Sequence, residues 1–153
     1  MDGKLEFRIA EEEDLYDIVR LLVQDQLGSL RETLTNPVPQ VYLDAFRAMG
    51  GQPENIYVIA VLNDEIVGCY QYTVIPGISR SGASRAQIEG VRVDEKCRGK
   101  GIGRLMFEDA KSRAKASGCK MVQLTTDKTR SDAQRFYNDL GFVNSHDGYK
   151  LEL

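Results

Sequence analysis

Hydrophobic and polar residues follow two different periods along the chain. Residues 5–9 alternate apolar and polar positions, as in a strand with one buried face. Leu15, Ile18 and Leu22 recur at helical spacing, after acidic residues at 11–14 that favour a helix N-terminus. Extended along the chain, the same reasoning predicts strands at 5–9, 56–62, 66–75, 86–93 and 120–126, helices at 15–22, 39–49, 101–117 and 131–140, and a last hairpin at 142–143 and 149–153.

Turn-forming residues separate these elements. Asn63-Asp64 joins two β-branched runs and predicts a hairpin, whereas residues 76–84, rich in Gly and Ser, predict a loop. Three predicted helices are expected to end at glycines, namely at Gly50-Gly51, Gly118 and Gly141. No repeat, linker or low-complexity segment is present, so we expect one mixed α/β domain over residues 1–153.

Composition narrows the class of protein. The chain has 153 residues, a net charge of −3 and a pI near 5.3, which argues against a general nucleic-acid binder. No apolar run approaches the ~20 residues that span a bilayer, and the N-terminus lacks the apolar core of a signal peptide. We therefore expect a cytoplasmic protein without membrane contact. Cysteines at 69, 97 and 119, with His146 as the sole histidine, suggest neither a disulfide framework nor a metal site.

Residues 91–104 carry the clearest signal for ligand binding. A predicted strand there runs into a glycine-rich loop that opens a predicted helix. The glycines let the backbone approach a ligand, and the free N–H groups of the helix start favour an anion such as pyrophosphate. The alternative is an ordinary strand-to-helix turn with solvated basic residues, because a glycine-rich turn alone is weak evidence for a phosphate site. Neither the Walker A nor the Rossmann spacing is present. The glycines of the loop are Gly99, Gly101 and Gly103, and its basic residues are Arg98, Lys100 and Arg104.

Three motifs occur in a recognisable order. Residues 98–103 match the acetyl-CoA signature R/Q-x-x-G-x-G/A, residues 88–93 look like a preceding strand, and residues 133–142 look like a late helix and turn. With these motifs the sequence resembles the Gcn5-related N-acetyltransferase (GNAT) superfamily, most strongly over residues 86–142. The resemblance implies a central, mostly antiparallel sheet with a splayed parallel strand pair, flanked by helices.

The resemblance also implies acetyl-CoA as cosubstrate and assigns residues to it. In the family, loop amides hold the pyrophosphate and the fourth strand pairs its backbone with the pantetheine arm. By position, the cofactor-binding residues are Val91, Val93, Arg98, Gly99, Lys100, Gly101, Ile102, Gly103 and Arg104. Arg130 stands where many relatives carry an asparagine, so a contact with a CoA phosphate is the alternative there.

The spacing within the fourth strand predicts a β-bulge. Ile88 and Val91 are three residues apart, whereas Val91 and Val93 are two apart. One extra residue near Gly90 would put all three on one face of the sheet. In a sheet that is buried on both faces, the same spacing can arise by chance.

Direct acetyl transfer needs a base for the amine and an acid for the leaving thiolate. Freeing a lysine-like amine of pKa ~10.4 at pH 7 costs about 4–5 kcal/mol. Glu89 matches a carboxylate that several family members use as base or water anchor, and Tyr137 matches the family's acid. The structural alternatives are a solvated or salt-bridged glutamate and a packed core tyrosine.

The acceptor is the least constrained part of the prediction. Gly90 stands where members acting on sugar phosphates often have an acid, and Cys97 is interpreted as loop structure rather than as an acetylated intermediate. Arg31, Arg80 and Arg85 could meet an acceptor's carboxylate or phosphate, although solvated arginines are an equal alternative. We expect a small-molecule amine acceptor. The alternatives are a protein lysine or N-terminus, or a CoA-binding module without turnover. The oligomeric state is open, with a homodimer among the alternatives.

Overall fold

The computed structural model describes residues 3–25 and 27–153, which form two compact units. The first unit is Met1–Gln123 and the second is Leu124–Leu153, and each is described by itself. Residues 1, 2 and 26 belong to the predicted 1–153 domain but lie outside the described residues.

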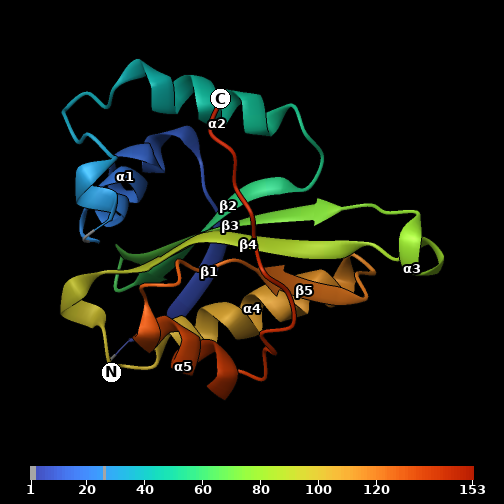
Figure 1. Ribbon diagram of the computed structural model, residues 1–153. Helices are drawn as coiled ribbons and strands as arrows, with labels where there is room; N and C mark the ends of the chain where they lie inside the picture. Colours follow the sequence, from blue (N-terminus) through green and yellow to red (C-terminus); the bar gives the residue numbers. More distant parts are fainter. Residues whose placement is uncertain (1–2, 26) are drawn as a thin grey trace. The chain divides into compact units, whose positions relative to one another are not determined.

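A five-stranded sheet forms the centre of the fold (Figure 1). Its strands lie in sequence order, with antiparallel pairing up to the fourth strand and parallel pairing of the last two. Together with the flanking helices, this sheet confirms the predicted mixed α/β fold. The strands are β1 Leu5–Ile9, β2 Asn55–Leu62, β3 Glu65–Ile75, β4 Arg85–Val93 and β5 Met121–Leu124.

Helices of the first unit cover both faces of this sheet (Figure 1). Helices α1 (Leu15–Val23) and α2 (Gln40–Gly50) lie on one face, where Ile18 and Leu21 of α1 pack in a buried cluster with Ile59 and Cys69. Helix α4, Ile102–Ala116, covers the opposite face. Because side chains alternate along a strand, β3 presents Cys69 to the α1 face and Tyr70 to the α4 face.

The connections agree with the predicted turns. The predicted loop contains only a short turn, α3 (Ser79–Gly82), in which Arg80 and Ser81 adopt left-handed backbone angles. Shorter 3₁₀ turns occur at Glu12–Asp14, Gly28–Leu30 and Glu95–Cys97. Among the described residues, none of the helices has both the length and the apolar character needed to cross a membrane.

The second unit contains helix α5, Ser131–Asp139, and an irregular C-terminal segment. The helix ends at Gly141, whose φ is +88°, and the Phe142 N–H closes the turn on the Tyr137 carbonyl at 3.0 Å. The predicted hairpin at 142–143 and 149–153 is wrong, because residues 142–153 form no strand. Val143 and Tyr149 are 80% and 94% exposed. Two residues supply too short a ladder for a partner strand, and isolated hairpins are marginally stable.

Candidate active site

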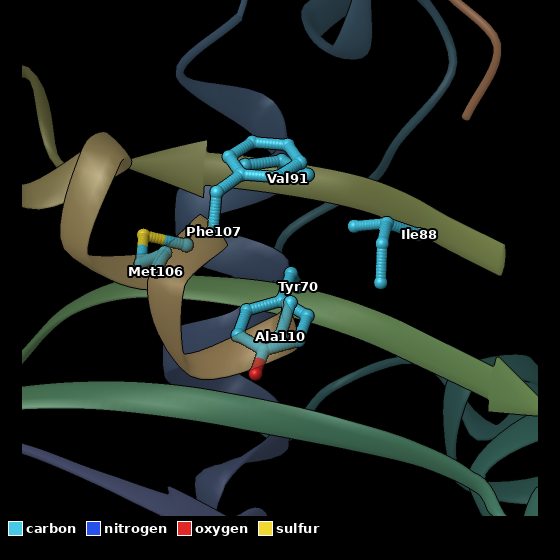
Figure 2. Close-up of a pocket in the computed structure, with 6 residues that line it drawn as sticks. All are labelled: Tyr70, Ile88, Val91, Met106, Phe107 and Ala110. Atoms are coloured by element: carbon cyan, nitrogen blue, oxygen red, sulfur yellow. The ribbon is translucent and has the colours of Figure 1, made fainter. Parts of the chain in front are cut away.

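Strand β4 contains the predicted bulge. Cys69 of β3 is paired with Arg92 and Gln71 with Glu89, so two residues of β4, Gly90 and Val91, stand opposite one residue of β3. Gly90 has a φ of +58°, which favours glycine. The bulge confirms the face assignment for Ile88 and Val91, which both lie on the α4 side (Figure 2).

The α4 side of the bulge is apolar. A small hollow there is lined by Tyr70, Ile88, Val91, Met106, Phe107 and Ala110 (Figure 2). The Tyr70 hydroxyl donates to Asp109 of α4, which also accepts from Arg113 Nε at 2.7 Å. Burial raises the pKa of Tyr70 far above its ordinary value. This network anchors α4 to the sheet beneath the bulge and engages the Asp109 carboxylate.

The opposite face of the bulge is polar. Tyr57 of β2 is paired with Gln71 of β3, and Gln71 is paired with Glu89 of β4, so the three residues form one cross-strand row. The Glu89 side chain is exposed and forms no salt bridge among the described residues. This face therefore carries an exposed carboxylate, Glu89, and its role in amine deprotonation stays a prediction.

Tyr57 is a candidate site residue that the sequence analysis did not find. A Cβ atom added to Gly90 would lie 2.9 Å from the Tyr57 hydroxyl oxygen, so this hydroxyl borders the bulge. Burial raises the pKa of Tyr57 well above its ordinary value, and the charges of Glu32 and Glu89 raise it further, whereas Arg92 opposes them. The phenol is therefore protonated at neutral pH. Only the register across three strands brings it to Gly90, and no local sequence signal reports that register.

The turn after β4 is fixed to α1 by a carboxylate. Asp94 accepts hydrogen bonds from Arg20 Nη1 at 2.6 Å, from the Lys96 N–H at 3.0 Å and from Gln24 Nε2 at 3.3 Å. Burial would raise the pKa of Asp94, but these donors together hold it below its usual range. Arg98 is also engaged, because its Nε donates to the Val93 carbonyl at 3.1 Å. This bond shapes the loop, and the role of Arg98 in cofactor binding stays a prediction.

The glycine loop leaves open space at the start of α4. Gly99 and Gly101 have φ of +73° and +83°, and a Cβ added to either would meet nothing within 4 Å. The Leu105 N–H bonds the Gly101 carbonyl at 3.2 Å, so the N–H groups of residues 102–104 precede the first i→i−4 bond of the helix. Lys100 and Arg104 are exposed beside them. Open space, free amide donors and two cations fit a pyrophosphate.

Ile102 and Gly103 complete the loop. The side chain of Ile102 is 1% exposed, so only its backbone N–H is available to a ligand. Strand β5 lies beside the first half of β4: the Lys120 N–H donates to the Ser84 carbonyl, and Gln123 Nε2 donates to Gln87 Oε1 at 2.6 Å. Val91 and Val93 follow the bulge, farther along β4 than these two contacts. The structure thus brings together Glu89, the bulge and the glycine loop within one unit.

Tyr137 and Arg130 belong to the second unit and are described within it. Arg130 is the residue before α5, at its N-cap position. Tyr137 is half-buried, with its ring centroid 5.6 Å from that of Phe136 and 6.1 Å from that of Phe142. Ala133, Phe136, Tyr137 and Leu140 are less exposed than the other described positions of residues 131–140 and form one face of this segment. The chemical roles of Tyr137 and Arg130 stay predictions.

Comparison with known proteins identifies the family. The sequence model of the Acetyltransferase (GNAT) family matches residues 19–142, and the chain belongs to this family of N-acetyltransferases. Membership implies acetyl-CoA as the acyl donor, which the glycine loop fits.

Three similar proteins are described in different ways, one as a transcriptional regulator and two as N-acetyltransferases. A crystal structure of a transcriptional regulator from Bacillus halodurans C-125 is 43% identical, with a TM-score of 0.94 over 98% of this chain and 100% of that one. Glucosamine 6-phosphate N-acetyltransferase of Trypanosoma brucei brucei is 28% identical over 97% of this chain and 96% of its own length. Aminoalkylphosphonate N-acetyltransferase of Salmonella typhimurium is 29% identical over 70% of this chain and 69% of its own length.

Proposed function

We propose that the chain transfers the acetyl group of acetyl-CoA to the amine of a small molecule by direct attack on the thioester. The observation that carries the proposal is the bulge in β4, where the exposed Glu89 carboxylate stands beside Gly90 on the strand that leads into the glycine loop. Two relatives are named as acetyltransferases of small amines, which supports a small acceptor.

The donor is held mainly by backbone groups in this proposal. The N–H groups of residues 102–104 bind the pyrophosphate, and Lys100 and Arg104 add charge-assisted contacts. Backbone groups of Val91 and Val93, on the part of β4 that follows the bulge, pair with the pantetheine arm. Arg98 contributes indirectly, through its bond to the Val93 carbonyl. Arg130 binds a CoA phosphate.

Glu89 and Tyr137 divide the proton transfers between them. Glu89 takes a proton from the acceptor ammonium, through a water molecule because its side chain faces solvent. The strand amides at the bulge polarise the thioester carbonyl. Tyr137 protonates the departing thiolate, since phenols and alkyl thiols titrate within about two units of each other.

The face of the sheet that carries Glu89 also carries a cation, Arg85, for the acceptor. Arg85 lies four residues before Glu89 on the same strand, and even spacing places it on the same face before the bulge. Both named relatives act on amines that carry a phosphorus oxyanion, glucosamine 6-phosphate and aminoalkylphosphonates. We propose that Arg85 meets such a group.

A regulatory CoA-binding protein without turnover is the second candidate function. It is favoured by the description of the Bacillus halodurans protein as a transcriptional regulator. Such a protein would bind CoA through the same glycine loop but would not need Glu89. The two candidate functions therefore differ in whether the protein acetylates an amine at a rate that depends on the Glu89 carboxylate.

Glu89→Gln should slow acetylation by about 10²-fold or more at neutral pH, because it keeps the shape of the side chain and removes the proton acceptor. The loss should shrink as pH rises toward the pKa of the amine, where less acceptor needs deprotonation. Steady-state rates with acetyl-CoA between pH 6 and 10 measure this profile. The control is Glu65→Gln, which neutralises another exposed glutamate of the sheet and should leave the profile unchanged. A Glu89→Gln profile that matches wild type removes Glu89 from the mechanism.

A further inference from the structure

The Tyr57 hydroxyl is a polar group without a partner in the described residues. Its ring packs against the apolar cluster under α1 and α2, and no hydrogen bond of the hydroxyl occurs among residues 3–25 and 27–153. Among the described side-chain atoms that are buried from solvent, only Arg92 Nε lacks a partner, so the unpartnered Tyr57 hydroxyl reaches solvent. It is therefore available to a ligand that binds at the bulge.

The neighbouring amide and hydroxyl side chains are already engaged with one another. Gln71 Nε2 donates to Asn55 Oδ1 at 2.9 Å, and Thr73 Oγ1 donates to the same oxygen at 3.1 Å. Arg92 Nη2 is paired with Asp25 at 3.3 Å, whereas its buried Nε has no partner among the described residues. The Tyr57 hydroxyl and the Glu89 carboxylate are therefore the two groups of the row that remain available; the hydroxyl borders Gly90, and Glu89 precedes Gly90 in β4.

Two carboxylates near Tyr57 can attract a cation. Burial and Cys69 raise the pKa of Tyr57 most, Arg92 lowers it, and Glu32 and Glu89 raise it by less than Arg92 lowers it. Neither carboxylate forms a salt bridge among the described residues, and Glu32 accepts the Tyr42 hydroxyl at 2.9 Å. Arg92 is paired with Asp25, which offsets part of its charge. An ammonium group beside the Tyr57 hydroxyl would thus be attracted by Glu32 and Glu89.

We infer that Tyr57 contacts the acceptor: its hydroxyl oxygen accepts a hydrogen bond from the acceptor amine and holds the nitrogen over Gly90, next to Glu89. The inference rests on the proposed function and adds a residue for acceptor binding. Glu89 takes one proton from the ammonium, while a second N–H stays on Tyr57 and the nitrogen lone pair is left free to attack. Tyr57 itself neither gains nor loses a proton.

Tyr57→Phe tests this role, with Tyr16→Phe as the matched control. Tyr16 lies on α1 and is 41% exposed, so its hydroxyl is expected to be dispensable. The probes are glucosamine 6-phosphate and 2-aminoethylphosphonate, each with acetyl-CoA. For whichever probe the wild type acetylates, Tyr57→Phe should lower kcat/KM for the amine about 10- to 100-fold, as expected for a lost hydrogen bond to a charged group. The KM for acetyl-CoA should stay within about twofold, and the melting temperature should not fall.

A second measurement tests the contact independently of activity. Gly90→Ala should lower the melting temperature, because it strains a left-handed residue and places a Cβ 2.9 Å from the Tyr57 hydroxyl oxygen. In the Tyr57→Phe background only the strain remains, so the same change should lower the melting temperature less. Equal losses in the two backgrounds would show that the hydroxyl does not border Gly90, and the inference would fail.

The outcomes separate this inference from the proposed function. If the wild type acetylates a probe and Tyr57→Phe does so equally well, the inference is wrong and the proposed function stands. A lowered melting temperature with unchanged kinetic constants would make the hydroxyl structural and would also contradict the inference. If the wild type acetylates neither probe, the proposed acceptor class, an amine with a phosphorus oxyanion, is contradicted, together with the role of Tyr57 in binding it.

Discussion

Gly101→Asp is expected to abolish CoA binding while the protein stays folded. A side chain at this position meets nothing within 4 Å, so the change creates no clash. The left-handed φ of +83° adds strain of about 1–2 kcal/mol. Two like charges ~4 Å apart repel by about 4 kcal/mol at an effective dielectric constant of ~20, which corresponds to roughly 10³-fold in affinity. Calorimetric titration with CoA measures the loss.

Two controls separate the effect of the aspartate charge on CoA binding from the effects of side-chain shape and backbone strain. Gly101→Asn has nearly the same shape and tolerates left-handed angles, so it should weaken CoA binding much less than aspartate does. Gly118→Asp places the same side chain after the other end of α4, at a φ of +71° and again in open space, and should leave CoA affinity unchanged. A folded Gly101→Asp variant with normal CoA affinity would exclude this loop as the pyrophosphate site.

Tyr137→Phe is expected to lower turnover by ~10²–10⁴-fold, the usual contribution of a positioned general acid. The change removes only the hydroxyl and keeps the ring contacts with Phe136 and Phe142, so the variant should fold. Because the acid acts on the leaving group, kcat should fall while the affinity for acetyl-CoA changes little. The control is Tyr149→Phe, which removes the hydroxyl of a residue that is 94% exposed, in the same unit.

Steady-state rates and melting curves on this one variant separate three roles. A raised KM with unchanged kcat would indicate that Tyr137 has a binding role. A lowered melting temperature with near-normal turnover would indicate that it has a packing role. Turnover within about twofold of wild type, once chemistry is known to limit the rate, would remove Tyr137 as the acid.

Local patterns in the sequence were sufficient for most of the fold. Strand β1 and helix α1 follow directly from their two periods, and Gly118 and Gly141 end helices because each adopts a left-handed φ. The bulge at Gly90 could also be predicted, because one extra residue in β4 changes which side chains share a face. These features depend on near neighbours in the chain, and a sequence displays such neighbours.

The features that were missed depend on distant partners. Tyr57 reaches the site only through the register of three strands, and the bond of Arg98 to the Val93 carbonyl forms only once the loop is folded. The support of the loop by Arg20 and Asp94 joins residues 74 positions apart. The predicted C-terminal hairpin was wrong for the opposite reason, since residues 149–153 alternate like a strand but no strand pairs with them in the structure.

The central claim is that acetyl groups pass from acetyl-CoA to a small amine. The most direct measurement follows thiol release from acetyl-CoA in the presence of glucosamine 6-phosphate, 2-aminoethylphosphonate, a diamine and a lysine-containing peptide, with the products identified by mass. The account predicts thiol release well above hydrolysis with at least one small amine, with a product heavier by one acetyl group, and a loss of this activity in Glu89→Gln. Tight CoA binding without amine-dependent thiol release would contradict the claim and favour a regulatory CoA-binding protein, and acetylation of the peptide alone would favour a protein acceptor.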